Sequence, residues 1–136
     1  MQEERYRVVT SFDLTTFEFV SEGLKGKIEK VVVYTEINLK DVYNLAFGDK
    51  DPITGFLNDL TVTNNGDSQK VLATVAATLY AFTDEKPSVA IIATGSTLAR
   101  TRLYRMGITN NLESIKQDFD IYGLTESKSW ELLKNI

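Results

Sequence analysis

Cysteine and histidine are both absent from this chain of 136 residues. Without thiols there is no disulfide and no cysteine nucleophile, and without imidazole there is no Ser-His relay. Zinc or haem sites that depend on either residue are excluded for the same reason. Carboxylates, hydroxyls, lysine and arginine are the side chains left for chemistry. The sequence therefore predicts no cofactor and no bound metal.

Long hydrophobic runs are also lacking. The longest dense apolar stretch, residues 89–93, is far too short to span a bilayer, and the charged residues that open the chain are unlike a secretion signal. We therefore expect a cytoplasmic protein without a membrane contact. Proline occurs only twice and no low-complexity linker divides the chain. We expect a single domain over residues 1–136, with residues 1–14 as a flexible or edge segment.

Positive charge is scarce, since 15 basic residues stand against 19 acidic ones. This balance argues against a broad nucleic-acid-binding face. The charge is unevenly spread, however, because residues 86–116 carry five basic groups and one acidic group, whereas residues 1–85 carry eight and fourteen. Three of the five arginines fall within six residues, namely Arg100, Arg102 and Arg105. If the protein has an anion site, it is expected in this segment.

The first half of the chain has the alternation typical of β-strands. Apolar and polar residues alternate over residues 17–21, 28–38 and 56–63, residues 42–47 are a further expected strand, and turn-forming residues separate these runs. In the second run, Val31 and Val33 share one face while Val32 and Tyr34 share the other. We expect an antiparallel meander of four strands.

Helical spacing follows this meander. Asp67 and Ser68 are good N-cap residues, an apolar stripe follows for about four turns, and Pro87 prevents continuation. Residues 88–94 are typical of a strand buried on both sides. A second helix is expected from Gly95 to about residue 106.

The last part of the chain is predicted in less detail. A short third helix is expected after Asn110, with Phe119 on its apolar face, and a last strand over residues 119–122. The tail, residues 127–136, fits either a helix or a strand. The whole pattern favours an α+β fold, with helices packed on one face of a mainly antiparallel sheet of about five or six strands. The expected core comprises Val31, Val33, Leu60, Val62, Val71, Val75, Leu79, Phe82, Ile91 and Leu103.

Several segments resemble a known family. The block Gly-Ser-Thr-x-x-Arg-Thr-Arg-Leu-Tyr at residues 95–104, with residues 17–23, 42–49 and 70–76, is similar to a family of small bacterial proteins classed as a domain of unknown function. The likeness covers about residues 17–130. It implies a single domain of this size and no assigned activity, so it identifies no catalytic residue.

The start of the second helix is the candidate anion site. A helix N-terminus exposes unpaired N–H groups and a partial positive charge, and a preceding glycine lets an anion approach the backbone. The residues of this site are Gly95, Ser96, Thr97, Arg100 and Arg105. The alternative is that these residues form an ordinary turn and helix cap, which is the more common use of such a sequence.

Arg102 is expected to have a different role. On a helical wheel it lies on the apolar face with Leu98 and Met106, whereas Arg100 points the opposite way. A charge that faces a core needs a carboxylate, carbonyl groups or a bound anion. A buried structural ion pair is therefore expected, and the candidate partners are Glu18, Glu36 and Asp59.

Three functions remain open from the sequence. The first is a non-enzymatic binding domain that takes a small anion or an acidic protein partner at residues 95–105. The second is a histidine-independent RNA-cleaving enzyme of the bacterial toxin kind, in which Arg100, Tyr104 and Arg105 stabilise the phosphate. The acidic balance of the chain is an argument against it, because affinity for RNA depends on the neutralisation of phosphate charge. The third is a structural subunit whose apolar surface another chain covers.

Overall fold

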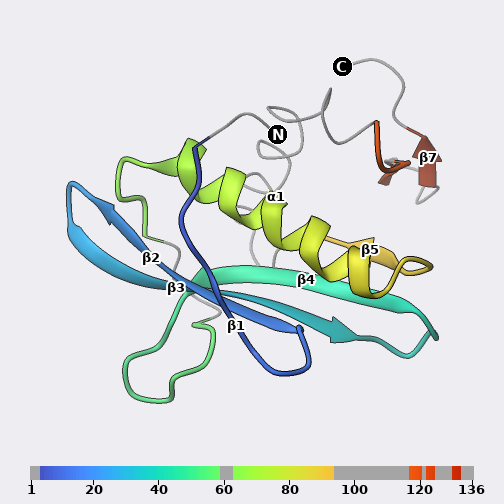
Figure 1. The fold of residues 1–136 in the computed structure, drawn as a ribbon, viewed down its shortest axis with the longest axis horizontal. Coiled ribbons are helices and arrows are strands. Elements are labelled where there is room, and N and C mark those ends of the chain that lie inside the picture. The colour runs from blue at the N-terminus through green and yellow to red at the C-terminus, as the bar shows by residue number, and fades with distance from the viewer. Residues whose placement is uncertain (1–3, 59–62, 94–116, 121, 125–129, 133–136) are drawn as a thin grey trace.

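The computed structural model describes residues 4–58, 63–93, 117–120, 122–124 and 130–132 of the chain (Figure 1). They form strands, one helix and their connections. The elements are β1 (Val9–Thr10), β2 (Thr16–Gly23), β3 (Gly26–Glu36), β4 (Val42–Asp49), α1 (Ser68–Glu85), β5 (Ala90–Ile92), β6 (Tyr122–Leu124) and β7 (Trp130–Leu132).

The main sheet has five strands in the order β1-β2-β3-β4-β5. The pairs from β1 to β4 are antiparallel, and β5 is parallel to β4. The parallel pair follows from the connection, because α1 carries the chain back along the sheet before β5 begins. The fold class expected from the sequence, α+β with a mainly antiparallel sheet, is confirmed at this level. A separate hairpin is formed by β6 and β7.

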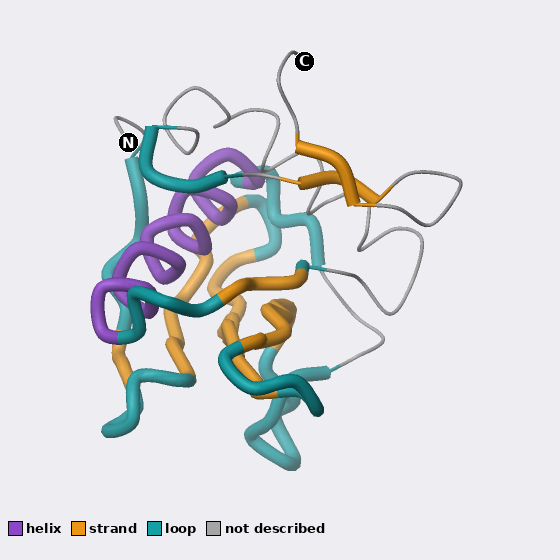
Figure 2. Tube along the Cα trace, turned by 90° about the vertical axis from the view of Figure 1, so that its right-hand side faces the viewer, coloured by secondary structure: helices purple, strands orange, loops and turns teal. Residues whose placement is uncertain are grey.

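The helix packs on one face of the sheet (Figure 2). Successive side chains of a strand point to opposite faces, so the strand pairing identifies which residues lie under α1. Phe17, Val32 and Phe47 are direct cross-strand neighbours on that face and are each at most 1% exposed. Phe82 of α1 stacks on the ring of Tyr34, with 4.2 Å between the ring centroids. The remaining members of this core are Phe19, Leu45, Val71, Leu72 and Val75.

The expected helical contribution to the core is confirmed. Val71, Val75 and Phe82 are buried in it, and Leu79 and Ile91 are partly buried against it. The helix also begins and ends as expected, after Asp67 and before Pro87.

The prediction of which face of β3 lies under the helix is wrong. Val32 and Tyr34 lie under the helix, so Val31 and Val33 point to the opposite face. Val31 is nevertheless buried there, with 3% of its surface exposed. The expected core residues Leu60, Val62 and Leu103 lie outside the described residues.

Two predicted strands differ from the structure. Of the run expected at 56–63, residues 56–58 and 63 are described, and they contribute only an isolated bridge between Lys50 and Leu57. The segment instead closes a turn in which the Asp51 N–H donates to the Phe56 carbonyl. The strand after α1 is shorter than expected and is not buried on both sides, because Ala90 is exposed and Ile91 is half-buried.

The last part of the chain is described only in short pieces. Phe119, expected in a third helix, lies outside any helix or strand, and the next strand is β6 rather than residues 119–122. The tail that fitted either a helix or a strand contains strand β7. The expected second helix lies outside the described residues. In the part of the chain that is described, no helix combines the length and the apolar character needed to cross a membrane.

Candidate functional site

The anion site expected from the sequence lies outside the described residues. This applies to Gly95, Ser96, Thr97, Arg100 and Arg105, and equally to Arg102. Two of the three carboxylates considered as partners of Arg102 are described. Glu18 is half-exposed on the face opposite α1 and pairs with Lys50 at 2.6 Å, and exposed Glu36 accepts the backbone N–H of Asp41. Each of these two carboxylates therefore already has a partner among the described residues.

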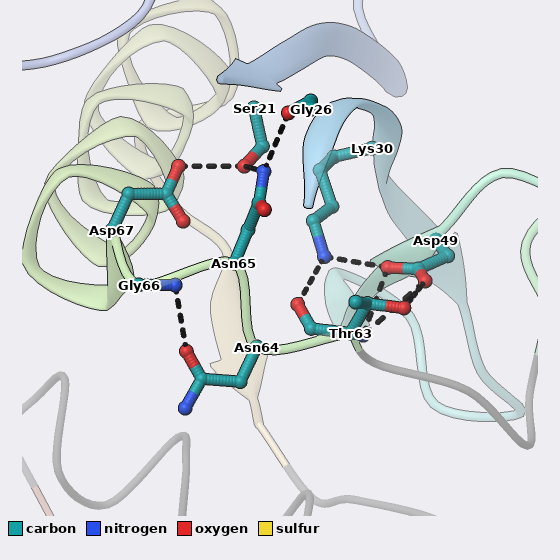
Figure 3. A network of polar contacts seen from close by, with 9 residues as sticks. All are labelled: Ser21, Gly26, Lys30, Asp49, Thr63, Asn64, Asn65, Gly66 and Asp67. Carbon is teal, nitrogen blue, oxygen red and sulfur yellow. Dashed lines mark hydrogen bonds and ion pairs between the residues drawn. The ribbon is translucent and has the colours of Figure 1, made fainter. Parts of the chain in front are cut away.

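A group of hydrogen-bonded polar side chains lies where the chain enters α1, and three of them, Ser21, Lys30 and Asn65, are at most 1% exposed (Figure 3). They come from four places: the N-terminal segment, the paired strands β2 and β3, the end of β4, and the connection that leads into the helix. We refer to these residues as the polar network. Its members are Tyr6, Ser21, Lys30, Asp49, Thr63, Asn65 and Asp67.

Lys30 and Asp49 form the charged part of the polar network. They are direct cross-strand partners of β3 and β4, on the face that α1 covers. The Lys30 ammonium donates to Asp49 Oδ1 at 2.5 Å and to the Thr63 carbonyl at 2.9 Å. Thr63 donates to the same carboxylate, from its hydroxyl at 2.5 Å and from its backbone N–H at 3.2 Å. The pair therefore ties the connection before α1 to the centre of the sheet.

The ionisation of Asp49 follows from these contacts. Burial alone would raise the pKa of this carboxyl group. The hydrogen bonds from Lys30 and Thr63, with the charge of Lys30, outweigh burial and hold the pKa of Asp49 below its usual value. The carboxylate is therefore charged at neutral pH, and the ion pair is the stable form.

Asn65 is the centre of the neutral part. Its side-chain amide donates to Ser21 Oγ at 3.1 Å and to the Gly26 carbonyl at 2.9 Å. Its side-chain oxygen accepts the Lys25 N–H at 2.6 Å. The approach is so close that a Cβ on Gly23 would lie 2.0 Å from the Asn65 carbonyl oxygen. Glycine at position 23 therefore allows the β2–β3 hairpin to reach this turn.

Asp67 precedes the helix, as the sequence predicts, but its side chain makes no capping hydrogen bond. Its Oδ2 instead accepts the hydroxyl of Ser21 at 2.6 Å and that of Tyr6 at 2.5 Å. Burial and the bond to Asp67 raise the pKa of Tyr6, so its hydroxyl stays protonated at neutral pH. The carboxylate thus joins the helix start to β2 and to the N-terminal segment.

This arrangement has few means of catalysing a reaction. Lys30 is 1% exposed, so no substrate can reach its ammonium group. Every buried side-chain nitrogen and oxygen of the described residues has a hydrogen-bond partner. The same residues contain no group of three or more carboxylates that could hold a metal ion. The polar network therefore has a structural role, in which it joins the sheet to the connection before α1 and to the start of the helix.

The polar network was not predicted from the sequence. Lys30 carried no usable signal, because with Val31 and Val33 expected in the core it falls on the outward face of its strand. Asn65 carried none, since an asparagine in a turn is ordinary.

Comparison with known protein families gives one match. A model described as a family of unknown function, DUF6934, matches residues 2–135. The chain belongs to this family. The resemblance to a family of unknown function is therefore confirmed, and it covers more of the chain than residues 17–130. The chain matches no curated protein and no solved structure. Since the family has no described activity, function must be argued from the residues.

Proposed function

We propose that the protein is a non-enzymatic binding domain that takes a small anion or an acidic protein partner at residues 95–105. The supporting observation is the distribution of charge. Residues 86–116 carry five basic groups and one acidic group, whereas the rest of the chain carries ten and eighteen. A local positive segment in an acidic protein attracts anions to one place.

The described structure supports a binding role over a catalytic one. Lys30 and Asp49 of the polar network are both buried, and they bond to one another and to Thr63. The effect of the network is to fix α1 on the sheet. A rigid frame of this kind suits a domain whose function depends on presenting a surface.

Within the proposed site, Arg100 and Arg102 have different roles. Arg100 contacts the ligand, together with the backbone N–H groups of Ser96 and Thr97. On the helical wheel, Arg102 falls on the apolar side of the predicted helix, where it would form a buried ion pair. Arg102→Ala should therefore lower the free energy of unfolding by about 3–5 kcal/mol, because it leaves a buried carboxylate unpaired. Arg100→Ala should change it by less than about 0.5 kcal/mol, as surface substitutions usually do.

A titration with inorganic phosphate, followed by backbone amide chemical shifts, tests the proposal. We expect shifts that saturate at Ser96 and Thr97 and that weaken in Arg100→Ala. Arg7→Ala is the matched control, because Arg7 is an exposed arginine far along the chain from this segment. It should leave the binding curve unchanged.

Two results would contradict the proposal. One is a set of small shifts spread over the surface that respond equally to Arg7→Ala and Arg100→Ala, which would indicate general screening. The other is cleavage of a short RNA by the purified protein that Arg100→Ala abolishes, because this would make the domain an enzyme.

A further inference from the structure

The N-terminal residues form an extended segment, here called the strap (residues 4–10), that runs past the start of α1 to the edge of the sheet, where β1 pairs with β2 (Figure 1). Tyr6 is its anchor. The Tyr6 N–H donates to Thr74 Oγ1 at 2.9 Å, and its hydroxyl donates to Asp67 Oδ2 at 2.5 Å. The ring stacks on Phe19 at 5.7 Å, and the Lys70 ammonium lies 4.3 Å from the ring centroid. The strap thus completes both the core and the polar network.

Other contacts also hold the strap to the sheet, since the Tyr6 hydroxyl accepts the Glu22 N–H at 3.0 Å and Val8 packs against the core. Strand β1 pairs with β2 at only two positions, Val9 with Glu18 and Thr10 with Phe17. Both β1 residues are exposed. The residues that contact Tyr6 therefore form a docking site, here called the seat. The strap, an extended segment that ends in the edge strand β1, occupies it.

The turn that joins the strap to the body, residues 11–15, stores strain. Leu14 has a φ of 61°, in the left-handed region that is costly for a residue with a Cβ. Asp13 offsets this cost, since its Oδ1 accepts the hydroxyls of Ser11 and Thr15 at 2.8 and 2.7 Å. These bonds lower the pKa of Asp13. The same turn holds the side chain of Phe12 fully in solvent.

We propose that two copies of the chain exchange their straps, so that Tyr6 of each copy occupies the seat on the other. Every contact of the strap is kept in such a dimer, because the seat is identical. The turn at residues 11–15 opens into an extended link, which removes the left-handed φ of Leu14 and gives up the hydrogen bonds that Asp13 accepts within the turn. Short connections under strain favour exchange of this kind. The inference is independent of the proposed anion site.

Disulfide trapping tests the exchange directly, because the natural chain has no cysteine. A Val9→Cys chain and a Glu18→Cys chain are unfolded, mixed, refolded together at high concentration and oxidised. Positions 9 and 18 are cross-strand partners on one face, at a spacing that a disulfide can bridge. Exchange predicts a covalent dimer of the two different chains. Leu39→Cys with Glu18→Cys is the matched control for chance collision, since Leu39 is 63% exposed in another turn.

Two further variants address the cause of the exchange. Leu14→Gly removes the strain and should lower the dimer fraction in light scattering, whereas Asp13→Ala loosens the closed turn and should raise it. Circular dichroism confirms that each variant is folded. Crosslinking of Val9→Cys with Glu18→Cys no faster than the Leu39→Cys control would overturn the proposal. A dimer fraction that neither Leu14→Gly nor Asp13→Ala changes would overturn it as well.

Discussion

Replacing Lys30 by methionine should destabilise the fold strongly. The two side chains of this ion pair are 1% and 12% exposed, so water cannot replace the lost partner. Asp49 would keep the donors of Thr63 but lose the cation that balances its charge. Breaking a buried pair by removing one partner costs about 3–5 kcal/mol, a large part of the about 5–15 kcal/mol that stabilises a typical domain.

Urea unfolding followed by circular dichroism measures this loss as a lower midpoint. Lys27→Met is the matched control, because Lys27 is in the same strand, is 77% exposed and lies 3.7 Å from Glu22. It should change the free energy of unfolding by less than about 0.5 kcal/mol. Changing both partners, as Lys30→Met with Asp49→Leu, should restore much of the stability, since no unpaired charge remains.

The pH dependence gives a second test of the same pair. The pKa of Asp49 is lower in the folded protein than in the unfolded chain, so its contribution to stability is complete above the ordinary aspartate pKa of about 3.9 and is lost as the pH falls through the folded value. The difference between wild type and Lys30→Met should therefore shrink in this acidic range. A loss below about 1 kcal/mol at pH 7, or a difference that does not change with pH, would refute the reasoning.

Two other substitutions test the packing of the core. Phe82→Ala should cost about 3–5 kcal/mol, because this ring is fully buried, and half-buried Leu79→Ala should cost less, about 2 kcal/mol; equal losses in thermal melts would contradict the assigned helix face. Gly23→Ala should lower the melting temperature, because the new Cβ would collide with the Asn65 carbonyl oxygen. An unchanged melting temperature would show that the hairpin and the turn do not approach so closely.

The helix could be predicted well because its signals agree. The apolar stripe repeats at helical spacing, Asp67 precedes it and Pro87 follows it. Local sequence is enough to define an element when periodicity and both ends point to the same answer. Strands β2, β3 and β4 were also predictable, whereas β1 was not predicted as a strand and the strand expected at residues 56–63 is not found in the part of that run that is described.

The face of β3 could not be predicted from its own residues. Four consecutive residues, from Val31 to Tyr34, are apolar or aromatic, so alternation does not distinguish the two faces. The choice is made by the neighbouring strands, where Phe17 and Phe47 lie beside Val32. This pairing is information about the register, which a single strand does not carry.

The polar network was out of reach for a related reason. Lys30, Asp49 and Asn65 are far apart in the sequence and belong to residue types that are common on surfaces. The pairing of Lys30 with Asp49 depends on the register of β3 with β4. The contacts of Asn65 depend on the close approach that Gly23 allows. The anion site at residues 95–105 stays a prediction from local charge and the expected helix start.

The polar network is closed in the structure, so solvent does not reach the ammonium group of Lys30. The most direct test is the labelling of lysines with an amine-reactive reagent, followed by mass spectrometry of the folded protein. Lys30, 1% exposed, should react only as fast as the protein unfolds, whereas Lys27, 77% exposed, should react at once. Labelling of Lys30 as fast as Lys27 would mean that the network opens to solvent and would contradict the account.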